Sequence, residues 1–112
     1  MIGKLIIDTL IPLNIPVCFQ RYSGNAETYI TFHEYFSSGE EFEDDEEAYI
    51  SHYIQIDLWS KSDYTNLVKD IKDLLKAAGF NRLNEIDLYE EEIKIYHKGL
   101  KFYYLEGSDE NA

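Results

Sequence analysis

Three histidines are the residues of this sequence with the broadest chemical repertoire. His33, His52 and His97 could meet across neighbouring strands as ligands of a metal ion, but their spacings match no local ligand pair. The sequence contains one cysteine, Cys18, so no second thiol completes a ligand set. We therefore expect ordinary histidines on a sheet surface, partly buried, and predict no metal site.

Cys18 could act as a nucleophile only with a nearby base and an activating environment. It lies between Val17 and Phe19 in an apolar stretch, where a thiol behaves as a small hydrophobic group. A structural role is therefore expected. A single cysteine also excludes an internal disulfide and fits a reducing compartment.

The sequence has many carboxylates, and a pair of them could act as the catalytic groups of a hydrolase. Asp57 or Glu34 with Glu85 would be examples, yet nothing in the sequence places two of them across a cleft. The sequence has no glycine-rich phosphate loop and no Gly-x-Ser-x-Gly motif. We expect no enzymatic activity and no cofactor.

The densest charge lies in the stretch 40–47, where seven of the eight residues are acidic. A calcium loop needs a glycine turn inside the ligand run, whereas Gly39 precedes this one. We interpret residues 37–48 as a long acidic loop that becomes ordered on contact with a neighbour, with the aromatic residue at position 42 as its anchor. The candidate interface residues here are Glu41, Phe42, Glu43, Asp44 and Asp45.

Overall composition narrows the function classes. The 112 residues carry a net charge of −12, which repels a phosphate backbone and argues against nucleic-acid binding. Hydrophobic residues make up 45%, enough for a folded core. There is no apolar run of the ~20 residues that a membrane span needs, and residues 1–10 lack the layout of a signal peptide. The sequence is typical of a cytoplasmic protein.

The hydrophobic pattern predicts the elements that must position these groups. Near-helical spacing predicts a short helix over residues 1–11, although its apolar run would also suit a strand. A strand is predicted at 15–22, and a second at 27–36 with Phe36 on the same face as Ile30 and Phe32.

Farther along, strict alternation over residues 49–59 predicts the strongest strand. Residues 60–63 offer a capping box for an amphipathic helix that Gly79 ends as a left-handed cap. A hairpin of residues 83–89 and 93–105 follows, with a bulge expected near residues 98–99 because the apolar residues change parity there.

This order of elements predicts an α+β fold, with an antiparallel four- to five-stranded sheet and the helices packed on one face. Residues 1–105 form a single domain, and residues 106–112 form a polar, flexible tail. Tyr29, Tyr53 and Trp59 fall on the sheet face opposite the apolar one. Two interpretations stay open: these aromatic residues are cross-strand partners, or they form an interface with another subunit.

Several segments carry a resemblance to a known family. They are YIQIDLWSKSDY at 53–64 with AAGF at 77–80, IPV at 15–17, NAETYIT at 25–31, DLYEE at 87–91 and IYHK at 95–98. Over roughly residues 1–105 the chain resembles the tail-terminator and head–tail joining proteins of long-tailed bacteriophages and prophages, particularly those of Gram-positive hosts.

The resemblance implies an α+β fold and assembly with other copies as a ring, usually a hexamer, on the finished tail tube. Such a ring stops tube growth and presents a surface to the head completion protein. It implies no catalytic residues. The protein would be found in the host cytoplasm during assembly and then in the virion, at the head–tail interface.

Two rival functions remain. An acidic DNA mimic would inhibit a nucleic-acid-binding protein, but it needs spaced carboxylates on a rigid surface, whereas the acids here cluster in one expected loop. A small-molecule enzyme would need a polar pocket of convergent titratable groups between helix and sheet.

Overall fold

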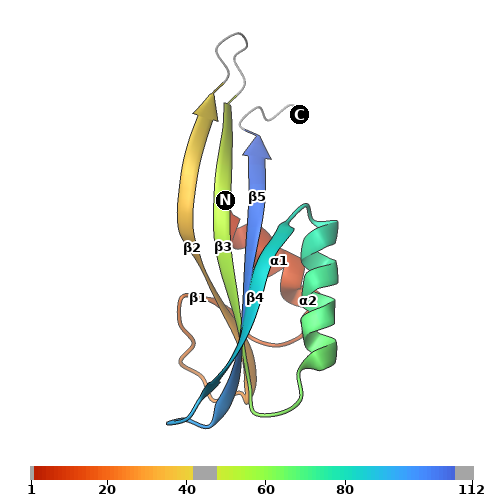
Figure 1. The fold of residues 1–112 in the computed structure, drawn as a ribbon. Helices are drawn as coiled ribbons and strands as arrows, with labels where there is room; N and C mark the ends of the chain where they lie inside the picture. The colour runs from red at the N-terminus through yellow and green to blue at the C-terminus, as the bar shows by residue number, and fades with distance from the viewer. Residues whose placement is uncertain (1, 42–47, 108–112) are drawn as a thin grey trace.

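The computed structural model describes residues 2–41 and 48–107 (Figure 1). Two helices and five strands follow one another along the chain. They are α1 (Ile2–Leu10), a 3₁₀ turn (Ile11–Leu13), β1 (Val17–Phe19), β2 (Thr28–Glu41), β3 (Ala48–Ser60), α2 (Thr65–Ala77), β4 (Asn81–Glu90) and β5 (Ile95–Gly107).

The strands form one sheet in the order β1-β2-β3-β5-β4. β1 pairs with β2 in parallel, and every other neighbouring pair is antiparallel. The predicted α+β fold is confirmed. The upper parts of β2, β3 and β5 extend beyond the two helices (Figure 1).

The core lies between one face of the sheet and both helices. Alternation along β3 directs Ile54, Ile56 and Leu58 to that face, where each is 1% exposed or less. The apolar stripes of the two helices pack against them. The other members of the core are Ile6, Leu10, Ile30, Phe32, Val68, Ile71, Leu75, Phe80, Leu100 and Phe102.

Different features of the sequence begin and end α2. The predicted capping box at its start is wrong, because Tyr64 occupies the cap position without a side-chain hydrogen bond. Instead, the Asp63 carboxylate accepts hydrogen bonds from the Thr65 backbone N–H (2.9 Å) and hydroxyl (2.8 Å). At the other end Gly79 adopts φ 102°, the left-handed conformation predicted for it. None of the helices in the described part of the chain is long and apolar enough to cross a membrane.

Three predicted strand boundaries are wrong. β2 continues to Glu41, through the first part of the expected loop, because β3 supplies backbone partners as far as Ala48. Pairing with a long neighbour thus outweighs the polar, glycine-containing sequence there. β1 has three residues where eight were expected, and β5 reaches Gly107, inside the expected tail.

The predicted bulge near residues 98–99 is also wrong. β5 pairs with β3 in unbroken register, and Ile95 points to the face opposite Leu100 and is buried there. The change of parity in the sequence therefore reflects apolar residues on both faces of one regular strand. The irregularities lie instead between Arg82 and Asn84 in β4 and between Glu34 and Phe36 in β2.

Candidate functional site

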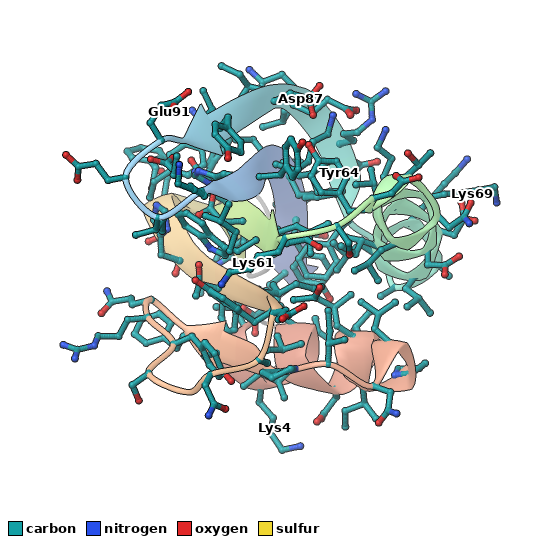
Figure 2. All side chains as sticks on the ribbon, turned by 90° about the horizontal axis from the view of Figure 1, so that it is seen from below. Lys4, Lys61, Tyr64, Lys69, Asp87 and Glu91 are labelled. Carbon is teal, nitrogen blue, oxygen red and sulfur yellow. The ribbon has the colours of Figure 1, made fainter. Side chains whose placement is uncertain are left out.

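The sheet has a second face, turned away from both helices, which we call the open face. Viewed along the strands, α1 and α2 lie on the same side of the sheet, and Lys4 and Lys69 point outward from them (Figure 2). Among the described residues, no helix or strand packs over the open face. The three aromatic residues predicted for this face, Tyr29, Tyr53 and Trp59, all lie on it.

At the lower end of the open face, aromatic rings form a continuous stack across three strands. Trp59 stacks on His97 with ring centroids 3.8 Å apart and an interplanar angle of 15°. Tyr29 stacks on the far side of Trp59 at 6.1 Å, and Tyr22 packs against Tyr29 at 4.4 Å. The indole Nε1–H donates to the Thr31 hydroxyl (3.0 Å). The stack therefore holds Trp59 in one orientation.

His97 is held between two carboxylates. Its Nε2 lies 2.7 Å from Asp57 Oδ1 and its Nδ1 lies 3.1 Å from Glu90 Oε2. Only a protonated imidazole ring can donate to both carboxylates at once, so this arrangement favours the charged form of His97. Burial opposes this charge, but the hydrogen bonds and attraction of both carboxylates prevail and raise the pKa of His97. Gln55 Nε2 also donates to Asp57 Oδ1 (2.8 Å).

Gly99 leaves room for this network. It lies opposite Asp57 on β3 and Ile86 on β4. A Cβ at position 99 would meet Ile86 Cγ2 at 3.3 Å and Asp57 Oδ1 at 3.6 Å. The close approach shows that Ile86 and the Asp57 carboxylate lie above the same strip of β5.

At the upper end of the open face, a second aromatic group surrounds Tyr53. Its ring centroid lies 5.1 Å from Tyr103, 5.6 Å from Phe36 and 6.1 Å from Tyr35. The Lys101 ammonium lies 4.9 Å above the Tyr35 ring, a cation–π contact. The bulge in β2 brings Phe36 to this face, so its predicted position beside Ile30 and Phe32 is wrong.

The open face is apolar and nearly neutral. The acidic and basic side chains in the contacts above are Asp57 and Glu90, which share His97 between them, and Lys101, which lies over the Tyr35 ring. Several large apolar side chains are at the same time more than 40% exposed. These are Tyr35, Phe36, Ile86, Leu88 and Leu105.

Sequence reasoning located part of this site. Phe42, Glu43, Asp44 and Asp45 lie outside the described residues, as does the side chain of Glu41, the last residue of β2. The group of His97 with its two carboxylates was missed. The pairing register of β3 and β5 would reveal this group, because it places Asp57 and His97 two positions apart on neighbouring strands. That register cannot be derived from a single sequence.

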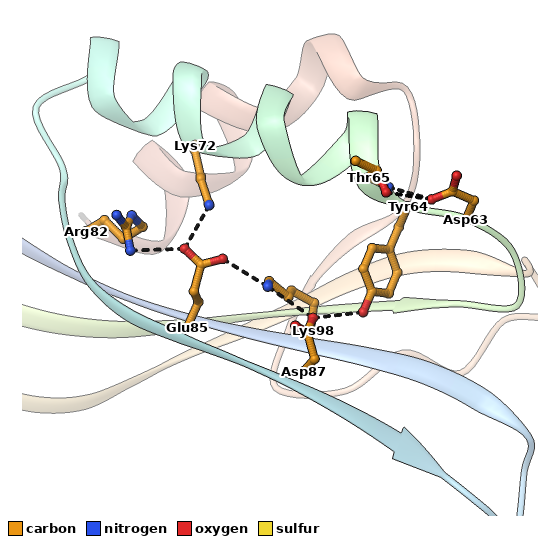
Figure 3. A network of polar contacts seen from close by, with 8 residues as sticks. All are labelled: Asp63, Tyr64, Thr65, Lys72, Arg82, Glu85, Asp87 and Lys98. Atoms are coloured by element: carbon orange, nitrogen blue, oxygen red, sulfur yellow. Dashed lines mark hydrogen bonds and ion pairs between the residues drawn. The ribbon is translucent and has the colours of Figure 1, made fainter.

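A second polar cluster lies on the helix side of the sheet, between α2 and β4 (Figure 3). Glu85 accepts contacts from three cations: Lys72 at 2.7 Å, Lys98 at 2.9 Å and Arg82 at 3.0 Å. The hydrogen bonds from Lys72 and Lys98 lower the pKa of Glu85 to about 2. The cluster joins the helix to the edge strand.

Asp87 completes this cluster. It lies 3.0 Å from the Lys98 ammonium and accepts a hydrogen bond from the Tyr64 hydroxyl at 3.1 Å. These two hydrogen bonds lower the pKa of Asp87, while burial and the bond to Asp87 raise the pKa of Tyr64. Each charged group named in the cluster has an opposite charge as its partner, so its geometry accounts for a structural role.

The three histidines do not gather. His52 lies on the helix side, with Nδ1 2.5 Å from Glu34 and Nε2 2.8 Å from Glu106, whereas His33 and His97 lie on the open face. Within residues 2–41 and 48–107, no group of three or more His, Cys, Asp or Glu side chains is arranged to hold a metal ion.

No protein-family model and no curated protein matches the chain. The interpretation of the open face therefore depends on its own chemistry.

Proposed function

We propose that this protein is a structural subunit of a phage or prophage tail, a tail terminator that closes as a ring on the tail tube and joins it to the head. The open face is one of the two surfaces by which each subunit contacts its neighbours in the ring. The ring is made of copies of this chain, and the tail tube protein and the head completion protein are its other partners.

The charge of the open face carries this proposal. The chain has 22 acidic residues and a net charge of −12, yet Asp57 and Glu90 on this face share His97 between them, and the Lys101 ammonium lies nearby over the Tyr35 ring. Interface cores are depleted in charged residues and enriched in aromatic ones. A neutral aromatic face lets copies of a strongly acidic chain meet without placing like charges against each other.

The size of the open face is also adequate. It spans the four strands β2, β3, β5 and β4, about 19 Å at ~4.8 Å per strand, and about 40 Å along its longest strands. This gives a footprint of about 760 Å², close to the ~800 Å² that each partner buries in a standard interface.

The fold agrees with the one that the resemblance implies. Tail-terminator proteins are expected to be α+β, and the chain has a mostly antiparallel five-stranded sheet with two helices packed on one face. The agreement supports the proposal at the level of fold class.

Light scattering over a concentration series, combined with negative-stain microscopy, tests the proposal. We expect rings with a central hole, whose mass gives the number of subunits. Ile86→Glu places a charge on the open face without removing a core residue, so it should shift the protein to monomers. Ile11→Glu, at an equally exposed isoleucine in the 3₁₀ turn, is the matched control and should leave the rings intact.

A wild-type protein that is monomeric at every concentration would contradict the open face as a self-interface. Rings that persist in Ile86→Glu would show that subunits meet elsewhere. Open filaments or dimers in place of rings would remove the support for a terminator while retaining the interface.

A further inference from the structure

A separate surface lies at the edge of the sheet beside β2. β1 has only three residues and covers β2 at Ile30, Thr31 and Phe32. From His33 onward, no described segment lies along the outer edge of β2, as the upper half of that strand shows (Figure 1). An unpaired edge of this length is a template for another strand.

Hydrogen bonding identifies which backbone groups face this edge. Ile30 N–H donates to the Pro16 carbonyl and Gln20 N–H donates to the Phe32 carbonyl, so even-numbered residues in the lower half of β2 face outward. The bulge after Glu34 shifts the alternation by one residue. In the upper half, Ser37 and Gly39 therefore direct their backbone N–H and C=O groups away from β3.

A groove of about 640 Å³ adjoins this edge, on the helix side of the sheet between α1 and β2. Its walls are mainly apolar. They come from α1, β1, β2 and β3 and include Ile2, Ile6, Ile7, Phe19, Phe32 and Ile54. Ile7 and Phe19 are exposed, which leaves apolar surface available to an incoming side chain.

The charges of this surface favour a basic occupant. Lys4 and Asp8 at the groove form an ion pair with each other (2.6 Å), while Glu34 of its lining and Glu106 share the single ring of His52, so negative charge is in excess there. A second copy of a chain with net charge −12 would be repelled here, whereas a cationic segment would be attracted.

We propose that the upper edge of β2 and the α1–β2 groove form a strand-addition site for an extended, basic segment of a partner protein. Ser37 and Gly39 supply backbone hydrogen bonds, and one apolar side chain of the segment enters the groove beside Ile7. The excess of carboxylate charge at Glu34 and Glu106, which share one histidine, selects the charge of the segment. This site is distinct from the open face, and the inference does not depend on the proposed ring.

Peptide binding to the whole chain tests the site. The probe is a capped peptide of alternating valine and lysine, about eight residues long. The control is the same peptide with glutamate in place of lysine. We expect the basic peptide to bind saturably with a Kd of about 10–100 µM and to slow amide exchange at Ser37 and Gly39. The acidic peptide should not bind.

Two pairs of variants locate the binding. Ser37→Pro removes the outward N–H at an edge position that tolerates proline, and Ser37→Ala keeps it. Ile7→Lys adds a cation to the groove, and Ile11→Lys adds the same charge outside it. Binding should fall at least tenfold in Ser37→Pro and Ile7→Lys and stay within about twofold in the two controls. Circular dichroism confirms that each variant is folded.

Three results would overturn the inference. One is the absence of saturable binding of the basic peptide to the wild-type chain. Another is equal binding of the acidic peptide. The third is loss of wild-type self-association in Ser37→Pro, which would make a second copy the occupant of this edge. Failure of ring formation alone, with peptide binding intact, would contradict the proposed function and leave this site standing.

Discussion

A histidine held between two carboxylates makes the open face a preformed surface. The His97 ring stacks on Trp59 and lies within hydrogen-bonding distance of Asp57 and Glu90, so its two nitrogens are paired before any partner arrives. A buried charge that loses its partner is costly, because its desolvation is then uncompensated. We infer that this group fixes the position of the indole ring on the face.

The first prediction concerns Asp57, the buried partner of His97. Asp57→Asn keeps the shape of the side chain and removes its charge, so the free energy of unfolding in urea should fall by about 1–3 kcal/mol. The pKa of His97, measured by NMR, should fall as well. Glu90→Gln, at the more exposed carboxylate, should have a smaller effect on both quantities. Equal effects of the two substitutions would contradict the importance of burial here.

The second prediction concerns Glu85 in the cluster between α2 and β4. Its pKa is lowered from the usual 4.5 to about 2 in the folded chain, so its stabilisation is fully present above pH 4.5 and is lost as the pH falls through about 2. At pH 7, Glu85→Gln should cost about 1–2 kcal/mol, after allowance for solvent screening. The difference from wild type should shrink steadily between pH 4.5 and pH 2.

Denaturant unfolding over this pH range provides the measurement. Glu91→Gln is the control, because Glu91 is exposed in the turn between β4 and β5 and should change stability little at any pH. A difference between wild type and Glu85→Gln that stays constant from pH 7 to pH 2 would show that the ion pairs of Glu85 contribute no net stability.

At the level of elements, the bulge in β2 leads to the third prediction. Phe36 already lies opposite Tyr53 and Glu34 opposite Ile54, so deleting Tyr35 removes the extra residue and leaves the pairing unchanged. The deletion should keep the fold and cost about 1 kcal/mol, mainly through the lost contact with Lys101. Thermal unfolding and amide chemical shifts provide the check.

Deleting Thr31 is the matched control for this experiment. It removes one residue from a regular part of β2, so residues on one side of the cut must point to the wrong face of the sheet. The chain should then fail to fold or lose several kcal/mol. If both deletions were equally tolerated, β2 would lack a fixed register.

Periodicity explains why some elements could be predicted from the sequence. α2 combines a long 3.6-residue stripe with Gly79 at its end, and β3 alternates without interruption, so local pattern and tertiary packing agree there. Residues 37–41 are polar and contain a glycine, and only pairing with β3 makes them a strand. Tyr35 and Phe36 are both aromatic, so the pattern could not show which of them is the extra residue.

The candidate site was predictable only in its composition. Alternation correctly grouped Tyr29, Tyr53 and Trp59 on one face, because side chains two residues apart share a face in any strand. The pairing of Asp57 with His97 depends on how β5 is aligned with β3, and a one-residue slip would separate them. That alignment is set by the packed core.

At the level of the whole molecule, the two proposed surfaces differ in charge. On the open face Lys101 and His97 offset Asp57 and Glu90, although the chain carries −12 overall, whereas beside the β2 edge Glu34 and Glu106 share one histidine. Copies of the chain that meet through the open face must overcome repulsion between acids that lie elsewhere. A basic strand at the β2 edge is instead drawn in by that same charge.

The fourth prediction follows from this contrast. Salt screens both the repulsion between copies of the chain and the attraction of the basic peptide. Raising ionic strength from about 0.05 M to 0.3 M should therefore strengthen self-association and weaken binding of the valine–lysine peptide, each by about threefold or more. Sedimentation velocity measures the first and fluorescence anisotropy the second, on the same preparation. Self-association that weakens with salt would mean that opposite charges hold the copies together, which is incompatible with a neutral open face as the interface.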